Sequence, residues 1–307
     1  MIRNIISALN EKGIDYTLSA PMGSYTSFRT GGNAAILISP KNTDEIAFCT
    51  SLFAENDFPY MVIGLGSNLL FSDKGYNGAV IRLAENFSAI TISGDTLTAQ
   101  AGARLSAVCQ TGFKNGLFGM EFAGGIPGSV GGALMMNAGA YGGEIKDVLI
   151  STEVLMPDGN VETLSNEECA FGYRKSVFKN SGMTILSATF RLKKAETESE
   201  LEEAKQHLME LNNRRKTSQP LEFPSAGSTF KRPTGYYAAA LIDECGLKGF
   251  RVGGACVSMK HAGFVVNDLH ASARDIYLLM QCVQSMVMEK KGVALEPEVI
   301  LIGDFNA

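Results

Sequence analysis

The chain has 307 residues, of which 45% are hydrophobic and 19% are charged, and its formal net charge is −5. This length exceeds that of a domain with a single hydrophobic core, since domains usually hold about 100 to 200 residues. The composition excludes a disordered or collagen-like chain. The acidic balance excludes a general attraction to nucleic acid or to anionic membranes. An anionic ligand must therefore be held by local groups.

The first twelve residues predict an amphipathic helix, with Ile2, Ile5, Ile6 and Leu9 on one face. This pattern differs from a signal peptide, so we expect a cytoplasmic protein. The uncharged stretch 122–143 is long enough to span a bilayer, but its eight glycines and one proline make a poor membrane helix. Six cysteines stand at long, irregular spacings without companion histidines, which predicts reduced core thiols and no metal site.

Short apolar runs alternate with one helical segment near the start of the chain, a pattern typical of a small α/β unit. We expect strands at 34–39 and 60–64 and a helix at 43–56. Asn42 and Glu45 have the spacing of a capping box for that helix.

Antiparallel pairing is expected in the middle third. Two strands within 88–101 turn about Gly94-Asp95, and a second pair flanks residues 157–160. A further strand is expected at 183–193, and the acidic stretch 196–203 opens a long polar helix that reaches Arg215. Beyond this expected domain boundary, the chain predicts a helical stretch near 237–244, a helix at 272–291 and a last strand at 297–302.

Glycine is concentrated between Gly124 and Gly143, where it fills eight of twenty positions. We call this stretch the glycine segment. Glycine permits positive φ and lets a ligand approach backbone N–H groups, which can form an anion-binding nest. Since the segment holds no Lys or Arg, the pattern predicts a diphosphate bound by backbone dipoles. The alternative is a set of tight turns and close backbone packing.

A second candidate loop, Gly64-Leu65-Gly66-Ser67-Asn68, follows the apolar strand 61–63. The G-x-G-x-x-G fingerprint of a Rossmann site requires glycine where Leu69 stands, and no G-K-[ST] of a P-loop occurs. A conventional nucleotide site is therefore not predicted. Taken alone, the loop fits a ligand site or a strand-ending turn equally well.

Several motifs, in order along nearly the whole chain, resemble those of the UDP-N-acetylenolpyruvoylglucosamine reductases, flavoenzymes that complete UDP-N-acetylmuramic acid for bacterial cell walls. The motifs are Gly64 to Asn68, Gly124 to Gly132, Asn137 to Gly142, Phe171-Gly172-Tyr173-Arg174, Pro224 to Lys231 and Glu296-Pro297-Glu298-Val299. The short chain looks like the shorter form of the family, which lacks an inserted tyrosine-bearing loop.

The resemblance implies an α+β fold in which two FAD-binding subdomains of the vanillyl-alcohol-oxidase type precede a C-terminal α+β substrate-binding domain. The implied subdomains are 1–83 and 84–195, the substrate-binding domain is 196–296, and the last strand, within 297–307, returns to the first subdomain. The FAD contacts carried over by the resemblance are Gly64, Gly66, Ser67, Asn68, Gly124, Gly125, Ile126, Gly128, Ser129, Gly131 and Gly132.

The chemistry implied by the resemblance uses NADPH to reduce bound FAD, which then passes hydride to C3 of the enolpyruvyl group. Arg174 matches the arginine that binds the substrate carboxylate, Glu298 the carboxylate that works with it, and Ser228 the serine that protonates C2. A guanidinium fork suits a carboxylate and a developing enolate. Without the resemblance, Arg174 reads as a surface arginine, Glu298 carries no signal and Ser228 reads as a turn serine.

Tyr141, Tyr173, Lys231 and Asn267 are the candidate substrate contacts under this resemblance. The role of His261 stays open between a site residue and a structural histidine. Two positions depart from the expected pattern, because Ile300 and Ser218 replace an arginine and a lysine. Lys216, Arg214 or Arg232 could supply the missing charge.

The expected partners are small molecules, namely the UDP-sugar enolpyruvyl ether and NADPH, with no nucleic acid, no membrane and no metal, and the expected state is a monomer. One alternative is another FAD oxidoreductase of the same fold. A second is a non-catalytic nucleotide-sugar sensor, which would have no use for Arg174, Ser228 and Glu298 together.

Overall fold

The computed structural model describes residues 2–305, which form a mixture of helices and strands in two compact units. Unit 1 comprises the residues up to 17 together with 37–65 and 79–215. Unit 2 comprises 18–36, 66–78 and the residues from 216 onward. The three-part division expected from the sequence stays a prediction.

The strands β1 (Tyr16–Pro21), β2 (Asn33–Ile38), β5 (Tyr76–Arg82) and β3 (Tyr60–Ile63) form one sheet in that order. β3 and β5 pair in parallel, and β2 and β3 confirm the two strands predicted here. The helices α1 (Ile2–Glu11) and α2 (Thr43–Glu55) also form as predicted. A 3-10 turn, η1 (Met22–Tyr25), follows β1.

The cap of α2 differs in one respect from the predicted box. Asn42 Oδ1 accepts the N–H of Glu45 at 2.9 Å, as expected. The Glu45 carboxylate instead accepts the N–H of Lys41 at 2.8 Å, one residue before the expected donor. The reciprocal half of the predicted capping box is therefore wrong, although both bonds satisfy backbone donors at the start of the helix.

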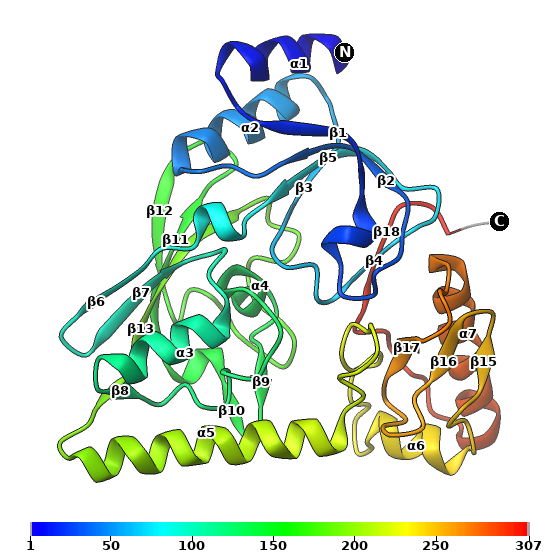
Figure 1. Cartoon of the computed structure of the whole chain (residues 1–307). Coiled ribbons are helices and arrows are strands. Elements are labelled where there is room, and N and C mark those ends of the chain that lie inside the picture. Colours follow the sequence, from blue (N-terminus) through cyan, green and yellow to red (C-terminus); the bar gives the residue numbers. More distant parts are fainter. Residues whose placement is uncertain (1, 306–307) are drawn as a thin grey trace. The chain divides into compact units, whose positions relative to one another are not determined.

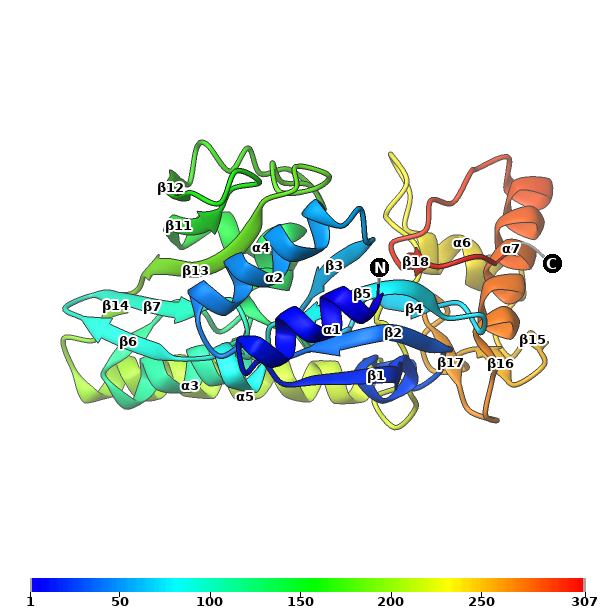
Figure 2. The same ribbon diagram turned by 90° about the horizontal axis from the view of Figure 1, so that it is seen from above.

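An antiparallel sheet of five strands forms most of the middle third, in the order β12-β11-β13-β7-β6. Both predicted hairpins occur within it, with Gly94 and Gly159 at positive φ in their turns. Figure 2 shows these strands on one side of unit 1. The strands are β6 (Ile90–Ser93), β7 (Thr96–Gln100), β11 (Leu149–Leu155), β12 (Val161–Ser165) and β13 (Thr184–Arg191).

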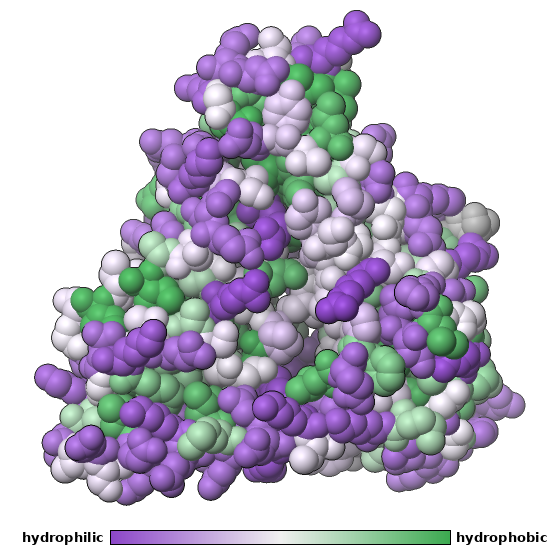
Figure 3. All heavy atoms as spheres, in the orientation of Figure 1, coloured by the Kyte–Doolittle hydropathy of each residue, from purple (hydrophilic) through white to green (hydrophobic). Residues whose placement is uncertain are grey.

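The long polar helix α5 (Glu198–Ser218) packs against α3 (Leu105–Lys114) in unit 1, where Ala204 meets Cys109 and Phe113. Figures 1 and 2 both show the two helices side by side. The edge over α5 in Figure 3 is largely hydrophilic, as the sequence predicts. The remaining elements of unit 1 are α4 (Val130–Met135), β8 (Leu117–Phe118), β9 (Gly139–Ala140), β10 (Gly143–Glu144), β14 (Lys193–Lys194), η2 (Glu85–Phe87) and η3 (Ile145–Asp147).

Unit 2 has a separate apolar core, which includes Phe28, Leu70, Ile276 and Val283. The helices α6 (Ala238–Glu244) and α7 (Ala273–Lys291) pack there with a sheet of β15 (Arg251–Val252), β16 (Ala255–Val257) and β17 (Val265–Asn267) (Figure 1). The last strand, β18 (Ile300–Ile302), pairs in parallel with β4 (Leu69–Phe71).

The six cysteines are free thiols, and five of them are buried, as expected from their spacing. Burial raises the pKa of both Cys49 and Cys109 to about 12. Within residues 2–305, no helix is long and apolar enough to cross a membrane.

Candidate active site

Tyr141 stands at the tip of a two-residue hairpin between β9 and β10. Tyr141 and Gly142 have φ values of 53° and 92°, the two positive values that a type I′ turn requires. A tyrosine in the left-handed region costs about 1 kcal/mol or more. The turn presents the ring at the surface, with 40% of the residue exposed.

Two arginines at the end of α5 meet this ring. The guanidinium carbons of Arg214 and Arg215 lie 5.1 Å and 5.7 Å from the Tyr141 ring centroid, within the range of cation–π attraction. Arg215 is only 8% exposed, and its Nε has no hydrogen-bond partner among the described residues. Burial lowers the pKa of Arg215, whereas interaction with Tyr141 opposes that shift, and an arginine keeps its charge at neutral pH.

Arg174 lies on a tight turn closed by two backbone bonds. Gly172 N–H donates to Lys175 O at 3.0 Å, and Lys175 N–H donates back to Gly172 O at 3.2 Å. Arg174 itself has a φ of 54°, and its guanidinium lies 5.4 Å from the ring centroid of Tyr173. The turn thus fixes the direction in which the arginine leaves the backbone.

The buried amide of Asn137 joins the Arg174 turn to the Tyr141 hairpin. Its Nδ2 donates to Glu144 Oε2 at 2.9 Å and to Gly172 O at 3.3 Å, and its Oδ1 accepts Lys146 N–H at 3.0 Å. Asn137 is 1% exposed and has a φ of 44°. The structure therefore brings Tyr141 and Arg174 into one cluster within unit 1.

Glu144 is the negatively charged member of this cluster. The pKa of its carboxyl is lowered by the hydrogen bond from Lys146, then by the Asn137 bond and by the positive charges of Lys146 and Arg174. The Lys146 ammonium lies 3.0 Å from Glu144 Oε2. Glu144 therefore stays ionised at neutral pH and offsets part of the positive charge around Arg174.

The glycine segment combines close packing with unused backbone donors. A Cβ at Gly143 would lie 2.7 Å from the Phe122 ring, and one at Gly125 would lie 3.1 Å from Arg215 Nε. These positions favour the packing explanation of their glycines. Among the described residues, the N–H groups of Gly125, Gly128 and Ser129 donate no hydrogen bond, so they remain available to an anion.

The loop from Gly64 to Asn68 is divided between the two units, with Gly64 and Leu65 in unit 1. A Cβ at Gly64 would overlap the hydroxyl of Ser129, so this glycine lies directly against the glycine segment. In unit 2, Gly66 has a φ of 64° and Asn68 Nδ2 donates to Glu298 O at 3.0 Å.

Ser228 and Glu298 lie on neighbouring backbone segments of unit 2. Glu298 N–H donates to Thr229 O at 2.8 Å, and Lys231 N–H donates to Glu296 O at 2.8 Å. We call residues 228–231 and 296–298 the strand pair. Ser228 is exposed and follows Gly227, whose φ is 75°, and Lys231 forms an ion pair with Glu296.

Asn267 and His261 make internal bonds in unit 2. Asn267 is 9% exposed, its Nδ2 donates to Phe28 O at 2.9 Å and its Oδ1 accepts Ala271 N–H at 2.7 Å. His261 Nδ1 accepts Gly263 N–H at 3.1 Å, and burial lowers the pKa of the ring. Both patterns are typical of structural residues, and a substrate role for Asn267 stays a prediction.

Sequence reasoning missed Asn137 and Arg215 as members of the site. Asn137 lies inside a motif that was recognised, but nothing in the sequence indicates that its amide is buried. Arg215 follows Arg214 in a polar helix, and only the packing of that helix buries one of the two. Ile300, at the start of β18, is 43% exposed.

A hollow of about 680 Å³ in unit 2 is lined by residues between Pro21 and Gly32 together with Asp73. None of the candidate site residues lines it. We therefore base the site on the Tyr141–Arg174 cluster and on the strand pair, and not on this hollow.

Comparison with known proteins identifies the family of the chain. Residues 34–165 match the family model of an FAD binding domain, and residues 219–302 match that of the UDP-N-acetylenolpyruvoylglucosamine reductase C-terminal domain. The UDP-N-acetylenolpyruvoylglucosamine reductase of Clostridioides difficile (strain 630) is 47% identical over 301 residues, which are 98% of this chain and 97% of the relative. That of Syntrophomonas wolfei is 42% identical, over 94% and 95% of the two chains.

The crystal structure of UDP-N-acetylenolpyruvylglucosamine reductase from Thermus caldophilus is similar to this chain, with a TM-score of 0.80 and 36% identity. The match covers 94% of this chain and 99% of that one. An FAD-binding domain followed by such a C-terminal domain defines an FAD-dependent oxidoreductase of α+β fold. The chain belongs to the UDP-N-acetylenolpyruvoylglucosamine reductase family. The predicted family, fold class, enzyme class and FAD cofactor are confirmed.

Proposed function

We propose that this enzyme reduces the enolpyruvyl group of UDP-N-acetylglucosamine enolpyruvate to give UDP-N-acetylmuramate, with NADPH as the hydride donor. The observation that carries the proposal is the Arg174 turn, which the buried Asn137 holds against the Tyr141 hairpin. Such a fixed guanidinium suits a substrate that carries a carboxylate next to the reacting double bond. The free cysteines suit a reducing compartment and support a cytoplasmic location.

The described residues fit an FAD diphosphate at the glycine segment. In the described part of the chain the N–H groups of Gly125, Gly128 and Ser129 donate no hydrogen bond, and the glycine at position 64 lets the loop 64–68 approach Ser129. Backbone donors of this kind hold phosphate oxygens without a lysine. FAD, when bound, supplies the carrier that takes hydride from NADPH and delivers it to the substrate.

Arg174 is the proposed electrostatic catalyst. When hydride reaches C3 of the enolpyruvyl group, negative charge develops at C2 and spreads into the carboxylate. A guanidinium held in place before the reaction stabilises this charge without having to reorganise. The hydrogen bonds of Asn137 and the positive φ of Arg174 indicate such preorganisation.

Ser228 is the proposed proton donor to C2, with Glu298 working beside it on the strand pair. The backbone bond from Glu298 N–H to Thr229 O keeps the two segments in register. No heavy atom lies within 4 Å of an ideal Cβ at Gly227, so the backbone before Ser228 is open to a ligand. A hydroxyl is a weak acid, and its efficiency as a donor therefore depends on position.

Tyr141 and Arg215 are proposed to bind an anionic part of the substrate. The Nε of Arg215 is buried and has no hydrogen-bond partner within residues 2–305, a costly state that an anionic oxygen would relieve. This assignment supplies a positive charge in place of those missing at Ile300 and Ser218. Tyr173 and Lys231 stay candidate substrate contacts.

A stopped-flow experiment on the Ser228→Ala enzyme tests the proposal. We expect flavin bleaching by NADPH at the normal rate, and reoxidation by UDP-N-acetylglucosamine enolpyruvate slowed roughly 10²- to 10⁴-fold, the range for loss of a general acid. Ser225→Ala, three residues earlier on the same loop, should behave like the unchanged enzyme. Equal losses in both half-reactions would exclude the proton-donor role. Rapid reoxidation by oxygen alone, without response to the substrate, would favour another FAD oxidoreductase.

A further inference from the structure

Both peptide groups that flank Glu298 are hydrogen-bonded to other segments of unit 2. The N–H of Glu298, in the first peptide group, donates to Thr229 O at 2.8 Å. The carbonyl oxygen of Glu298, in the second, accepts Asn68 Nδ2 at 3.0 Å. Because peptide groups are planar, two held planes determine φ and ψ of the residue between them and thus the direction of its Cα–Cβ bond. These two bonds therefore direct the Glu298 side chain.

The first of the two bonds joins backbone atoms and ends on a well-anchored residue. Thr229 is 1% exposed, its N–H donates to Gly263 O at 2.8 Å, and its Oγ1 accepts Val265 N–H at 2.9 Å. A backbone carbonyl is present at every position, so this bond requires no particular side chain at 229 as its acceptor. The second bond is different, because its donor is the side chain of Asn68.

Asn68 lies where β4 begins to pair with β18. Ile300 N–H donates to Asn68 O at 3.0 Å, and Ile300 stands opposite Leu69 in the parallel register. If the ladder continued by one rung, the N–H of Asn68 would donate to Glu298 O. The side-chain amide makes that bond instead, and within residues 2–305 the N–H of Asn68 donates no hydrogen bond. The hold on Glu298 O therefore depends on which residue occupies position 68.

The loop that carries Asn68 is itself closely packed. A Cβ at Gly66 would overlap Tyr25 O, and Gly66 has a φ of 64°. Ser27 N–H donates to Gly66 O at 3.2 Å, which joins this loop to the segment before β2. The Asn68 amide is thus presented to Glu298 from a fixed backbone.

We propose that Asn68 is a positioning residue for the substrate step, in which its side-chain amide holds Glu298 in the direction that the chemistry requires. The inference rests on the role proposed for Glu298. It separates the side chain of Asn68 from the FAD contact that the family resemblance implies at this position. Any variant except proline keeps the N–H at position 68, so loss of the side chain alone should leave FAD binding intact.

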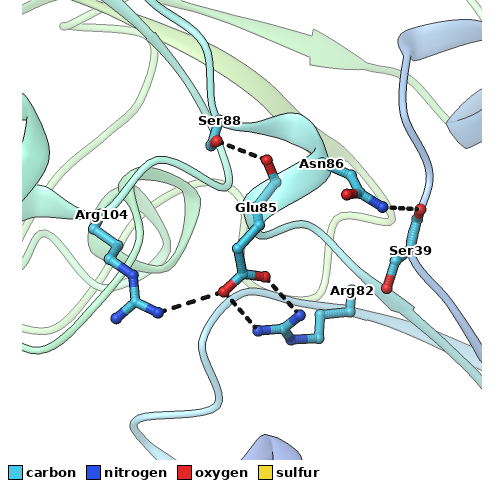
Figure 4. Close-up of polar contacts among 6 residues, drawn as sticks. All are labelled: Ser39, Arg82, Glu85, Asn86, Ser88 and Arg104. Carbon is cyan, nitrogen blue, oxygen red and sulfur yellow. Dashed lines mark hydrogen bonds and ion pairs between the residues drawn. The ribbon is translucent and has the colours of Figure 1, made fainter.

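Asn86 offers a matched control in unit 1. Its Nδ2 donates to Ser39 O at 3.0 Å, so it also joins two distant segments by an amide-to-carbonyl bond, as Figure 4 shows. The neighbouring Glu85 carboxylate accepts bonds from Arg82 and Arg104 and does not contact this amide. Replacing Asn86 by alanine therefore removes a bond of the same kind without touching the strand pair.

Stopped-flow absorbance on the full-length, FAD-loaded enzymes tests the proposal. Asn68→Ala should keep the Kd for FAD and the rate of bleaching by NADPH. Reoxidation by saturating UDP-N-acetylglucosamine enolpyruvate should slow at least ~10-fold, since a misplacement of about 1 Å can cost about 100-fold. Asn86→Ala should match the unchanged enzyme in all three measurements. A raised Kd for FAD with normal reoxidation would overturn the inference and make the Asn68 side chain a cofactor contact.

A double-mutant cycle separates positioning from a general structural loss. If Asn68 acts through the Glu298 carboxylate, Asn68→Ala should slow reoxidation no further in an enzyme that already carries Glu298→Ala. Equal slowing in both backgrounds would refute the positioning role. Circular dichroism and the Tm show whether each variant folds.

Asn68→Leu is the second variant, because leucine has nearly the size of asparagine but no donor. It should slow reoxidation as Asn68→Ala does, and a folded leucine variant that reoxidises at the normal rate would exclude the proposed bond. Failure of the unchanged chain to be bleached by NADPH or reoxidised by the substrate would instead contradict the proposed function itself.

Discussion

The Tyr141–Arg174 cluster of unit 1 and the strand pair of unit 2 hold their candidate groups in opposite ways. Asn137, Tyr141 and Arg174 all have positive φ, and a buried amide and adjoining glycines keep them there. Ser228 and Glu298 lie on segments held by backbone hydrogen bonds, which any residue except proline can make. The first region therefore depends on the buried side chain of Asn137, whereas the second relies on backbone bonds, to which the side chain of Asn68 adds one bond to Glu298 O.

Removal of the Asn137 amide should have the largest effect, and this effect should be confined to the Tyr141–Arg174 cluster. Asn137→Ala leaves a buried carbonyl and a carboxylate with fewer donors and places alanine at positive φ, so we expect a loss of ~2–4 kcal/mol in unfolding free energy. The Arg174 turn loosens as well, so reoxidation by substrate should slow at least ~10-fold. Denaturant titration and stopped-flow absorbance measure the two effects.

Asn267→Ala is the matched variant in unit 2, since this asparagine is also buried with two backbone partners. We expect a loss of stability with little change in the substrate step. A slowed substrate step at unchanged stability would instead support Asn267 as a substrate contact.

Three glycine substitutions have expected effects of intermediate size and compare the two regions. Gly143→Ala drives a Cβ into the Phe122 ring and should cost ~1–3 kcal/mol. Gly142→Ala meets no atom within 4 Å but adopts a φ of 92°, so it should cost only ~1 kcal/mol. Gly227→Ala, equally open at a φ of 75° before the strand pair, should match Gly142→Ala. Thermal unfolding of the three variants gives the order of their losses in stability. An equal loss of stability at Gly142 and Gly143 would contradict the packing explanation.

The smallest expected effect is the pH dependence of the Glu144 contribution. Its pKa is lower in the folded chain than the ordinary 4.5, so the stabilisation is complete above about pH 4.5 and is lost as the pH falls through the folded value. The Tm difference between the unchanged chain and Glu144→Gln should be largest near neutral pH and shrink in acid. A difference that grows on acidification would show that the lowered pKa is wrong.

The elements that the sequence predicted well are those with strong local signals. Sequence alone shows the helical pattern of α7, the long run of polar residues in α5 and the turn residues of both hairpins. The sheet of β15, β16 and β17 was not predicted, because two of its strands are only three residues long and the third only two. Such short strands are fixed by packing against α7 rather than by their own pattern.

The two possible roles of the glycine segment could not be distinguished from the sequence. Its density predicted backbone binding of a diphosphate and left close packing as the alternative. The structure supports packing at Gly125 and Gly143, and among the described residues the N–H groups of Gly125, Gly128 and Ser129 donate no hydrogen bond. Glycine serves both purposes for the same reason, namely its missing Cβ. Only the neighbours in space distinguish them.

The sequence by itself determined the family, the FAD cofactor and the identity of the candidate groups, because motif residues in a fixed order require no knowledge of the fold. Tertiary structure decided which of two adjacent arginines is buried, where the amide of Asn137 bonds, and that the amide of Asn68 meets the carbonyl oxygen of Glu298. Each of these features depends on residues that are distant in the sequence or on which face of a helix packs against the core. Burial, hydrogen bonding and pKa depend on such neighbours in space.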